Sequence, residues 1–302
     1  MDAFWIILTG SLVAVCCAMV GSFLVLKGMT MVGDAISHAV LPGIALAFLL
    51  SGSRDTLPML IGAGAVGMLS AFLIETLSRR GGLQADASIG VTFTWLFALG
   101  VMIITYYAGN VDLDQDCVLY GEIAYVPLDM WTLESGAEMG PRAVWMMGGV
   151  FAAVLGIILL FFKELKLTTF DPQFAAALGI APLLWHYVLM GCVSLTTVAA
   201  FESVGAIIVV ALFVVPPATA YLFTHNLRSM LWISSALGIS CAVGGYYLAV
   251  AIDGSIAGAM AVVAGAEFVL AVLFAPEGGV VTKLLKRENE EPEFLKGEVL
   301  KA

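Results

Sequence analysis

Residues 4–26 read FWIILTGSLVAVCCAMVGSFLVL, an apolar run without a charged side chain. An α-helix rises about 1.5 Å per residue, so this run is long enough to cross the hydrocarbon core of a bilayer, which is about 30 Å thick. The run lacks the basic leader and the small-residue cleavage signature of a removable signal peptide. We therefore expect a retained transmembrane helix at this end of the chain.

The composition of the whole chain extends this prediction. Of the 302 residues, 61% are hydrophobic and only 12% are charged, which is about half the charged fraction of an ordinary soluble protein. The formal net charge is −10, and no basic stripe exists that could neutralise phosphates, so nucleic acid is excluded as a partner. A cationic substrate suits this acidic chain better.

Nine apolar runs can be drawn as membrane spans. They are residues 4–26, 29–50, 57–77, 87–108, 143–162, 183–201, 203–223, 230–251 and 254–275. With the N-terminus placed outside, the inner connections hold 11 of the 13 basic residues, which is the positive-inside asymmetry. This asymmetry needs an odd number of crossings. We expect an all-α polytopic membrane domain over residues 1–276, with about nine transmembrane helices, eight being possible, and a charged cytoplasmic tail over residues 277–302.

Two connections are too long to be tight turns. The inner one spans residues 163–182, and the outer one spans residues 109–142. The outer connection carries a series of acidic side chains: Asp112, Asp114, Asp116, Glu122, Asp129, Glu134 and Glu138. It is either a solvated acidic cap or a surface whose field gathers positive ions.

The inner connection has the sequence signals of a short helix. Asp171 is placed to cap the N-terminus, Pro172 suits the first helical position, and Gly179 supplies a C-terminal stop. Apolar side chains recur at every fourth position and form one ridge: Phe170, Phe174 and Leu178. Such a helix could rest on the membrane surface, but the compact ridge favours docking into a groove of a partner protein.

Ionisable side chains inside apolar spans are costly unless they are paired or line a wet cavity. Asp34 and His38 lie at positions i and i+4 near the start of the second run, so their side chains share one helical face. A carboxylate oxygen and an imidazole nitrogen one turn apart can hold Zn²⁺, Mn²⁺ or Fe²⁺. The alternative is an Asp–His hydrogen bond that stabilises the start of the helix.

Two glutamates are further candidates. Glu202, between the sixth and seventh runs, is either solvated at the outer rim or an additional metal ligand. Glu267, deep in the last run, is a second-tier candidate, which could extend to the interface, be protonated or face a subunit seam. His186 and His225 fall at inner boundaries of their runs, where we expect an interfacial role.

Prolines weaken two of the predicted spans. Pro216 and Pro217 are expected to break the seventh run, and Pro42 with Gly43 repeats this weakness just after His38. Missing N–H groups inside a membrane helix are tolerated where the freed carbonyls meet neighbours or a water-filled path. The prolines therefore mark either packing kinks or a gated path.

The chain shows none of the motifs for a P-loop, an H-E-x-x-H zinc-protease helix or a G-x-S-x-G nucleophile elbow. We expect a transport protein that is not itself an enzyme.

Residues 33–43 read GDAISHAVLPG, which resembles the signature of the permease family of ATP-binding-cassette importers for zinc, manganese and iron. Residues 170–179, FDPQFAAALG, resemble the cytoplasmic motif of that family, and residues 209–220, VVALFVVPPATA, resemble a third stretch. The match closes with LFAP at residues 273–276 and covers most of the chain. The first motif is the most specific.

The resemblance implies a type II-like importer permease in the bacterial cytoplasmic (inner) membrane, which pairs with a second copy or a paralogue. Its inner loop would dock separate ATPase subunits, and its outer face would receive metal from an extracytoplasmic solute-binding protein. Ligand roles carry over to Asp34 and His38 and more weakly to Glu202, whereas Glu267 has no counterpart in the family pattern. No permanently bound cofactor is implied, only transported Mn²⁺, Zn²⁺ or Fe²⁺.

The expected mechanism is alternating access driven by partner ATPases, with a metal site that binds weakly enough to release its cargo. Counting residues places Glu202 near the outer end of its helix and Asp34 near the inner end of its own, so one shared site requires broken or shifted helices. The main rival is a secondary carrier or a channel for divalent cations. An intramembrane metalloenzyme is a third reading, which a lone Asp–His pair supports poorly.

Overall fold

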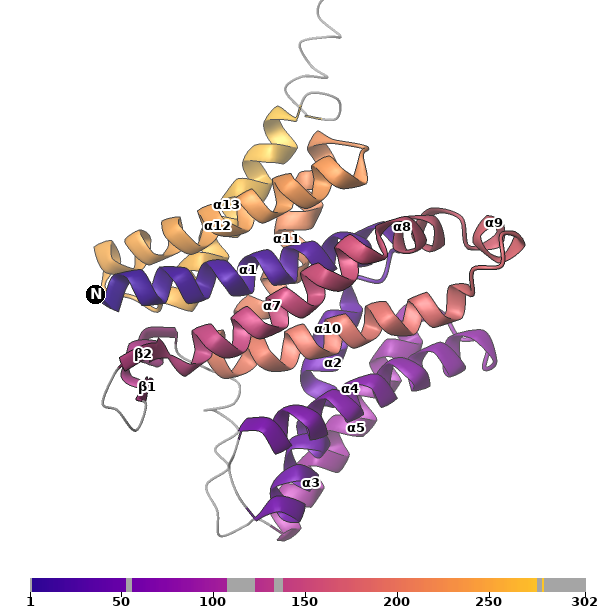
Figure 1. Ribbon diagram of the computed structural model, residues 1–302, viewed down its shortest axis with the longest axis horizontal. Coiled ribbons are helices and arrows are strands. Elements are labelled where there is room, and N and C mark those ends of the chain that lie inside the picture. Colours follow the sequence, from indigo (N-terminus) through magenta and orange to yellow (C-terminus); the bar gives the residue numbers. More distant parts are fainter. Residues whose placement is uncertain (1, 53–55, 108–122, 133–137, 276–278, 280–302) are drawn as a thin grey trace, which may run out of the picture.

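The computed structural model describes residues 2–52, 56–107, 123–132, 138–275 and 279 (Figure 1). Its first half contains α1 (Asp2–Leu26), α2 (Met31–Ala39), α3 (Leu41–Ser51), α4 (Thr56–Arg79), α5 (Ala85–Tyr107), the short 3-10 helix η1 (Ile123–Leu128) and the strands β1 (Met130–Thr132) and β2 (Glu138–Pro141). Its second half contains α7 (Arg142–Leu160), α8 (Phe162–Phe170), α9 (Pro172–Ala177), α10 (Pro182–Val204), α11 (Ala206–Phe223), α12 (Leu227–Ile252) and α13 (Ile256–Phe274).

The prediction of an all-α polytopic membrane protein is confirmed. Within the described residues, eight helical segments are long and apolar enough to cross a bilayer. One of them, Met31–Ser51, consists of the consecutive helices α2 and α3, so the second predicted span is present but divided. The predicted run 203–223 corresponds mainly to α11, which is a shorter apolar helix.

Part of the acidic outer connection has a structure that the sequence did not suggest. β1 and β2 form an antiparallel hairpin in which Met130 pairs with Pro141. Ahead of this hairpin, η1 buries Ile123 and Val126 in the main hydrophobic core. The segment that carries Asp112, Asp114, Asp116, Glu122 and Glu134, like the tail from residue 280, lies outside the described residues.

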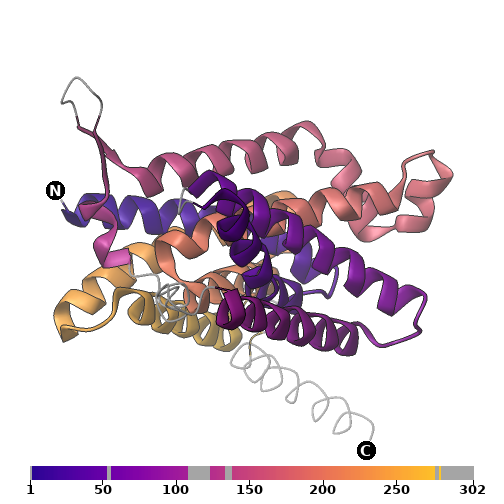
Figure 2. The ribbon, with the colours of Figure 1, turned by 90° about the horizontal axis from the view of Figure 1, so that it is seen from below.

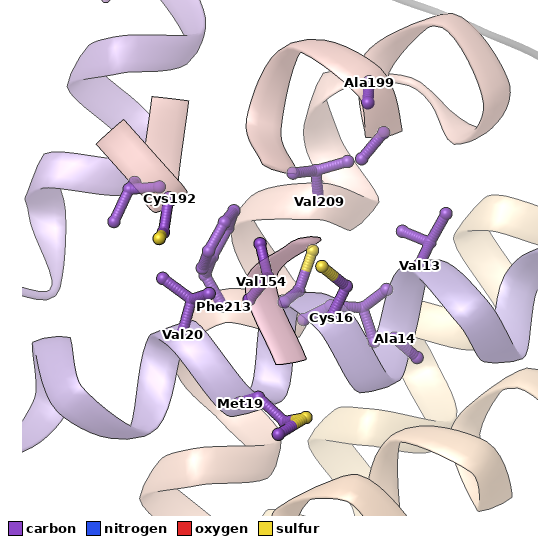
Figure 3. Packing of buried hydrophobic residues seen from close by; sticks show 14 of the residues in the cluster. Val13, Ala14, Cys16, Met19, Val20, Val154, Cys192, Ala199, Val209 and Phe213 are labelled. Carbon is purple, nitrogen blue, oxygen red and sulfur yellow. The ribbon is translucent and has the colours of Figure 1, made fainter. Parts of the chain in front are cut away.

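The helix α1 is the centre of the bundle. It packs against α11 and α12 on one side and against α7 and α10 on the other (Figure 1). The helices α2 to α5 form a second group, which joins the first through α4 and α10 and which Figure 2 shows on the near side of the bundle. Figure 3 shows the core inside the first group, where Val20 of α1, Phe213 of α11 and Cys192 of α10 are packed together.

The sharpest interruption in the second half lies at Gly205, not at the paired prolines. Gly205 has φ 84° and ψ 162°, a conformation that L side chains rarely adopt, and it separates α10 from α11. The expectation that Pro216 and Pro217 break their span is wrong, because α11 runs through both of them. Pro217 lacks the N–H group that would bond the carbonyl of Phe213, and that freed carbonyl lies against Gly21 of α1.

Candidate metal site and its surroundings

Asp34 and His38 lie on α2, a helix of only nine residues that ends just after the histidine. Val40, which has helical dihedral angles, joins α2 to α3, and α3 has Pro42 in its first turn. Gly100 of α5 makes room for this turn, since a Cβ atom at Gly100 would lie 2.8 Å from the nitrogen of Pro42. The weakness predicted at Pro42 and Gly43 therefore coincides with the point where the second span divides.

The two side chains face one another across a single turn. The distance from His38 Nε2 to Asp34 Oδ1 is 3.5 Å, longer than the usual hydrogen bond between such groups. The side chains are 32% and 39% exposed, whereas most of α2 is buried. An imidazole nitrogen and a carboxylate oxygen that are close together, loosely paired and accessible can both bind one divalent cation.

Aromatic rings surround this pair. The ring centroids of Phe93 and Phe97, both on α5, lie 6.1 Å and 6.0 Å from that of His38. The ring of Phe213 packs against Gly33, the residue before Asp34, where a Cβ atom would lie 3.5 Å from two ring carbons. The apolar walls limit the space beside the pair, so a cation bound there would exchange part of its water shell for these two ligands.

The other expected metal ligand, Glu202, lies in the last turn of α10, and its side chain is not among those described. Its neighbour Ser203 is 2% exposed, and the Ser203 hydroxyl has no hydrogen-bond partner. Among the described residues, no group of three or more His, Cys, Asp or Glu side chains could hold a metal ion. Asp34 and His38 thus form a pair to which Glu202, water or a partner chain would have to add further ligands.

Glu267, the second-tier candidate, lies elsewhere. Its carboxylate accepts hydrogen bonds from the Ser240 hydroxyl and, at 3.1 Å, from the Cys241 thiol. Both donors are on α12, so Glu267 ties α13 to α12 and already uses its two oxygens. This contact between two helices of one chain was not among the alternatives considered for Glu267.

The expected short helix of the inner connection is present as α9. The Asp171 carboxylate accepts a hydrogen bond from the N–H of Phe174 at 2.9 Å, and Gly179 follows the helix with φ 81°. Phe170 belongs to the end of α8, so the predicted ridge spans two helices. All three of its side chains are more than half exposed: Phe170, Phe174 and Leu178.

The sequence reading missed a charged cluster at the ends of α1, α4 and α10. His186 is 7% exposed, and its Nε2 lies 3.2 Å from Oε2 of Glu75; its interfacial role stays a prediction. The other oxygen of Glu75 pairs with Arg79. Burial lowers the pKa of Lys27 nearby, while Glu75 opposes this shift. Glu75 falls inside the predicted run 57–77, and an acidic residue there was the signal that could have revealed the cluster.

Comparisons with known proteins agree with this architecture. The chain is 50% identical to the manganese transport system membrane protein MntD of Bacillus subtilis, over 96% of this chain and 97% of that protein. It is 45% identical to the zinc transport system membrane protein TroD of Treponema pallidum, over 93% of this chain and 76% of that protein.

Among solved structures, PsaBC from Streptococcus pneumoniae in complex with Fab contains a chain of the same fold, with a TM-score of 0.76 at 32% identity and 94% of each chain covered. The model of one family, described as the ABC 3 transport family, matches residues 3–275, which include every helix described above. With its divided second span and its buried central helix, the chain is thus a multi-pass member of the ABC 3 transport family.

Proposed function

We propose that this protein is the membrane-spanning permease of an ATP-driven importer for divalent transition-metal ions, namely manganese, zinc or iron. The observation that carries the proposal is the Asp34–His38 pair, an accessible carboxylate and imidazole on one face of a short interrupted helix. Membership of the ABC 3 transport family and the names of the manganese and zinc relatives support it. The protein itself is a transport subunit, and ATP hydrolysis belongs to a separate partner.

The surroundings of the pair support transport rather than storage. Two protein ligands hold a cation less firmly than the four of a closed structural site, so the cargo can leave again. The junction between α2 and α3 at Val40 lies two residues beyond His38, about half a helical turn, and Pro42 follows it in the first turn of α3. In this proposal Glu202, in the last turn of α10, is a further ligand.

The partners follow from the exposed surfaces. The apolar side chains at the α8–α9 corner, in particular Phe174 and Leu178, form the docking site of the ATPase on the cytoplasmic side. The N-terminus lies outside, and the C-terminal tail is cytoplasmic, as the distribution of basic residues favours. The permease pairs with a second copy or a paralogue in the bacterial inner membrane, and an extracytoplasmic binding protein delivers the metal.

The test uses Asp34→Asn and His38→Gln in the complete transporter, reconstituted in proteoliposomes with its ATPase and its metal-loaded binding protein. Both substitutions keep size and hydrogen-bonding capacity but remove a metal ligand. We expect each variant to fold, to assemble with the ATPase and to lose most ATP-dependent uptake of radioactive manganese or zinc. The matched control is Asp253→Asn, which removes an exposed carboxylate at the end of α12.

Uptake at the wild-type rate in both variants would remove the pair from the transport path. Loss of folded protein, without a specific loss of transport, would make the pair a structural hydrogen bond instead. Uptake that persists without ATP while a membrane potential is maintained would favour a secondary carrier or channel.

A further inference from the structure

The helices α4 and α10 run antiparallel and meet at two polar points. At the first point, a Cβ atom on Gly67 would overlap the Ser194 hydroxyl, which donates a hydrogen bond to the Gly64 carbonyl at 3.3 Å. At the second point, Glu75 contacts His186 at 3.2 Å. The two points are eight residues apart on each helix, from Gly67 to Glu75 on α4 and from Ser194 back to His186 on α10. This separation corresponds to about 12 Å of helix. The two contacts are therefore in register along one seam.

The contact between Glu75 and His186 is costly to separate. The side chains are only 12% and 9% exposed, so a separated Glu75 carboxylate would be buried without its partner. The groups that face them are Arg79, on α4 itself, and Lys27, just beyond α1. Two cations around one carboxylate repel a divalent metal ion, so this cluster is not a second metal site.

The seam connects the docking segment, which is α9, to the metal pair, which is Asp34 and His38. α10 begins at Pro182, a few residues after the end of α9, so movement of α9 reaches His186 within little more than one helical turn. At the other end of the seam, a Cβ atom on Gly67 would lie 3.3 Å from the Ile36 side chain of α2. Ile36 lies between Asp34 and His38 in the chain, so α4 touches the helix that carries both candidate ligands.

We propose that Glu75 and His186 are positioning residues that couple the docking segment to the metal pair. The inference rests on the proposed function. Movement of α9 and the start of α10 is passed to the end of α4 through the Glu75–His186 contact. α4 then turns about its close contact at Gly67 and Ser194, and it shifts α2 relative to α11. Without the contact, ATP hydrolysis continues but no longer drives metal across the membrane.

The experiment compares Glu75→Gln and His186→Gln with Arg80→Gln in the reconstituted transporter. Arg80 is the exposed residue next to Arg79, so its substitution removes a charge at the same end of α4 without touching the pair. The readouts are ATP hydrolysis stimulated by the metal-loaded binding protein, uptake of radioactive manganese or zinc, and their ratio. Thermal unfolding and size-exclusion profiles report folding and assembly.

We expect both pair variants to keep ATP hydrolysis and to lose metal uptake per ATP by about tenfold, the scale of typical coupling between sites. Arg80→Gln is expected to keep the wild-type ratio. An unchanged ratio in the folded pair variants would overturn the proposal, as would an equal loss of hydrolysis and uptake.

Should the Gln variants fail to assemble, the same ratio of uptake to ATP hydrolysis is measured in Glu75→Asp. This variant keeps the charge but shortens the side chain by one methylene. A selective fall in its ratio supports coupling, and a wild-type ratio overturns it. Absence of ATP-driven uptake in the wild-type complex would refute the proposed function itself, and the two failures are thereby distinguished.

Discussion

Replacing Gly21 by alanine tests how α1 and α11 are held together. A Cβ atom at this position would overlap the carbonyl oxygen of Phe213 and would lie 2.9 Å from its carbonyl carbon. These are backbone atoms, which cannot rotate away as the end of a side chain could. The same carbonyl has lost its helical partner because Pro217 has no N–H group, and the backbone of Gly21 lies against it.

The size of the effect follows from two contributions. Overpacking of a well-packed core costs about 1–3 kcal/mol, and a buried carbonyl left without compensation costs about 1–3 kcal/mol. Since the gain in helix propensity from glycine to alanine offsets about 1 kcal/mol, we expect a net destabilisation of about 1–5 kcal/mol. At about 2–4 °C per kcal/mol for a chain of this order of size, the unfolding midpoint falls by about 2–20 °C.

The assay is thermal unfolding of the purified protein in detergent, with Gly10→Ala as the matched control. Gly10 is also on α1, but its Cβ atom would meet the flexible ends of Ile123 and Met260 at 3.2 Å and 3.4 Å. Both variants gain the same helix propensity, so their difference isolates the contact with Phe213. A midpoint for Gly21→Ala that equals or exceeds that of Gly10→Ala would refute the reasoning.

Two further predictions concern the seam and the topology. Gly67→Ala should destabilise the protein by about 1–3 kcal/mol, because its Cβ atom overlaps the Ser194 hydroxyl, and adding Ser194→Gly should restore most of that loss. The control is Gly64→Ala, whose Cβ atom meets no neighbouring atom and which should be tolerated. Failure of Ser194→Gly to restore stability would argue against the seam. In intact cells expressing a cysteine-free background, an impermeant thiol reagent should label Asp129→Cys but not Gln173→Cys, and labelling of Gln173→Cys would contradict a cytoplasmic position for α9.

The sequence predicted the membrane helices well because length and apolarity alone decide whether a helix can span a bilayer. It also predicted α9, where Asp171 caps the helix and Gly179 ends it, because such capping is a local interaction between residues close in the chain. The break after His38 followed from Pro42 for the same reason. Local chemistry was sufficient for each of these features.

The sequence failed where distant segments decide the outcome. Pro216 and Pro217 indicated a break, but their effect depends on whether another helix compensates the freed carbonyls, and Gly21 lies far away in the chain. The pairing of Glu75 with His186 likewise depends on the register between α4 and α10, which no local pattern specifies. The β1–β2 hairpin was missed because the expected acidic loop was judged by charge alone.

Phe213 shows why the position of the metal pair depends on residues that bind no metal. Its carbonyl lies against Gly21 of α1, and its ring lies against Gly33 of α2, one residue before Asp34. The distance between α1 and α2 at this depth is therefore set by one residue of α11, which is 1% exposed and cannot shift without moving both neighbours. The helix α2 has only nine residues and continues into α3 through Val40, so lateral contacts add to this junction in fixing its orientation. Movement of α11 or α4 would thus change the direction in which Asp34 and His38 face, while these two candidate ligands keep the spacing that their own helix imposes.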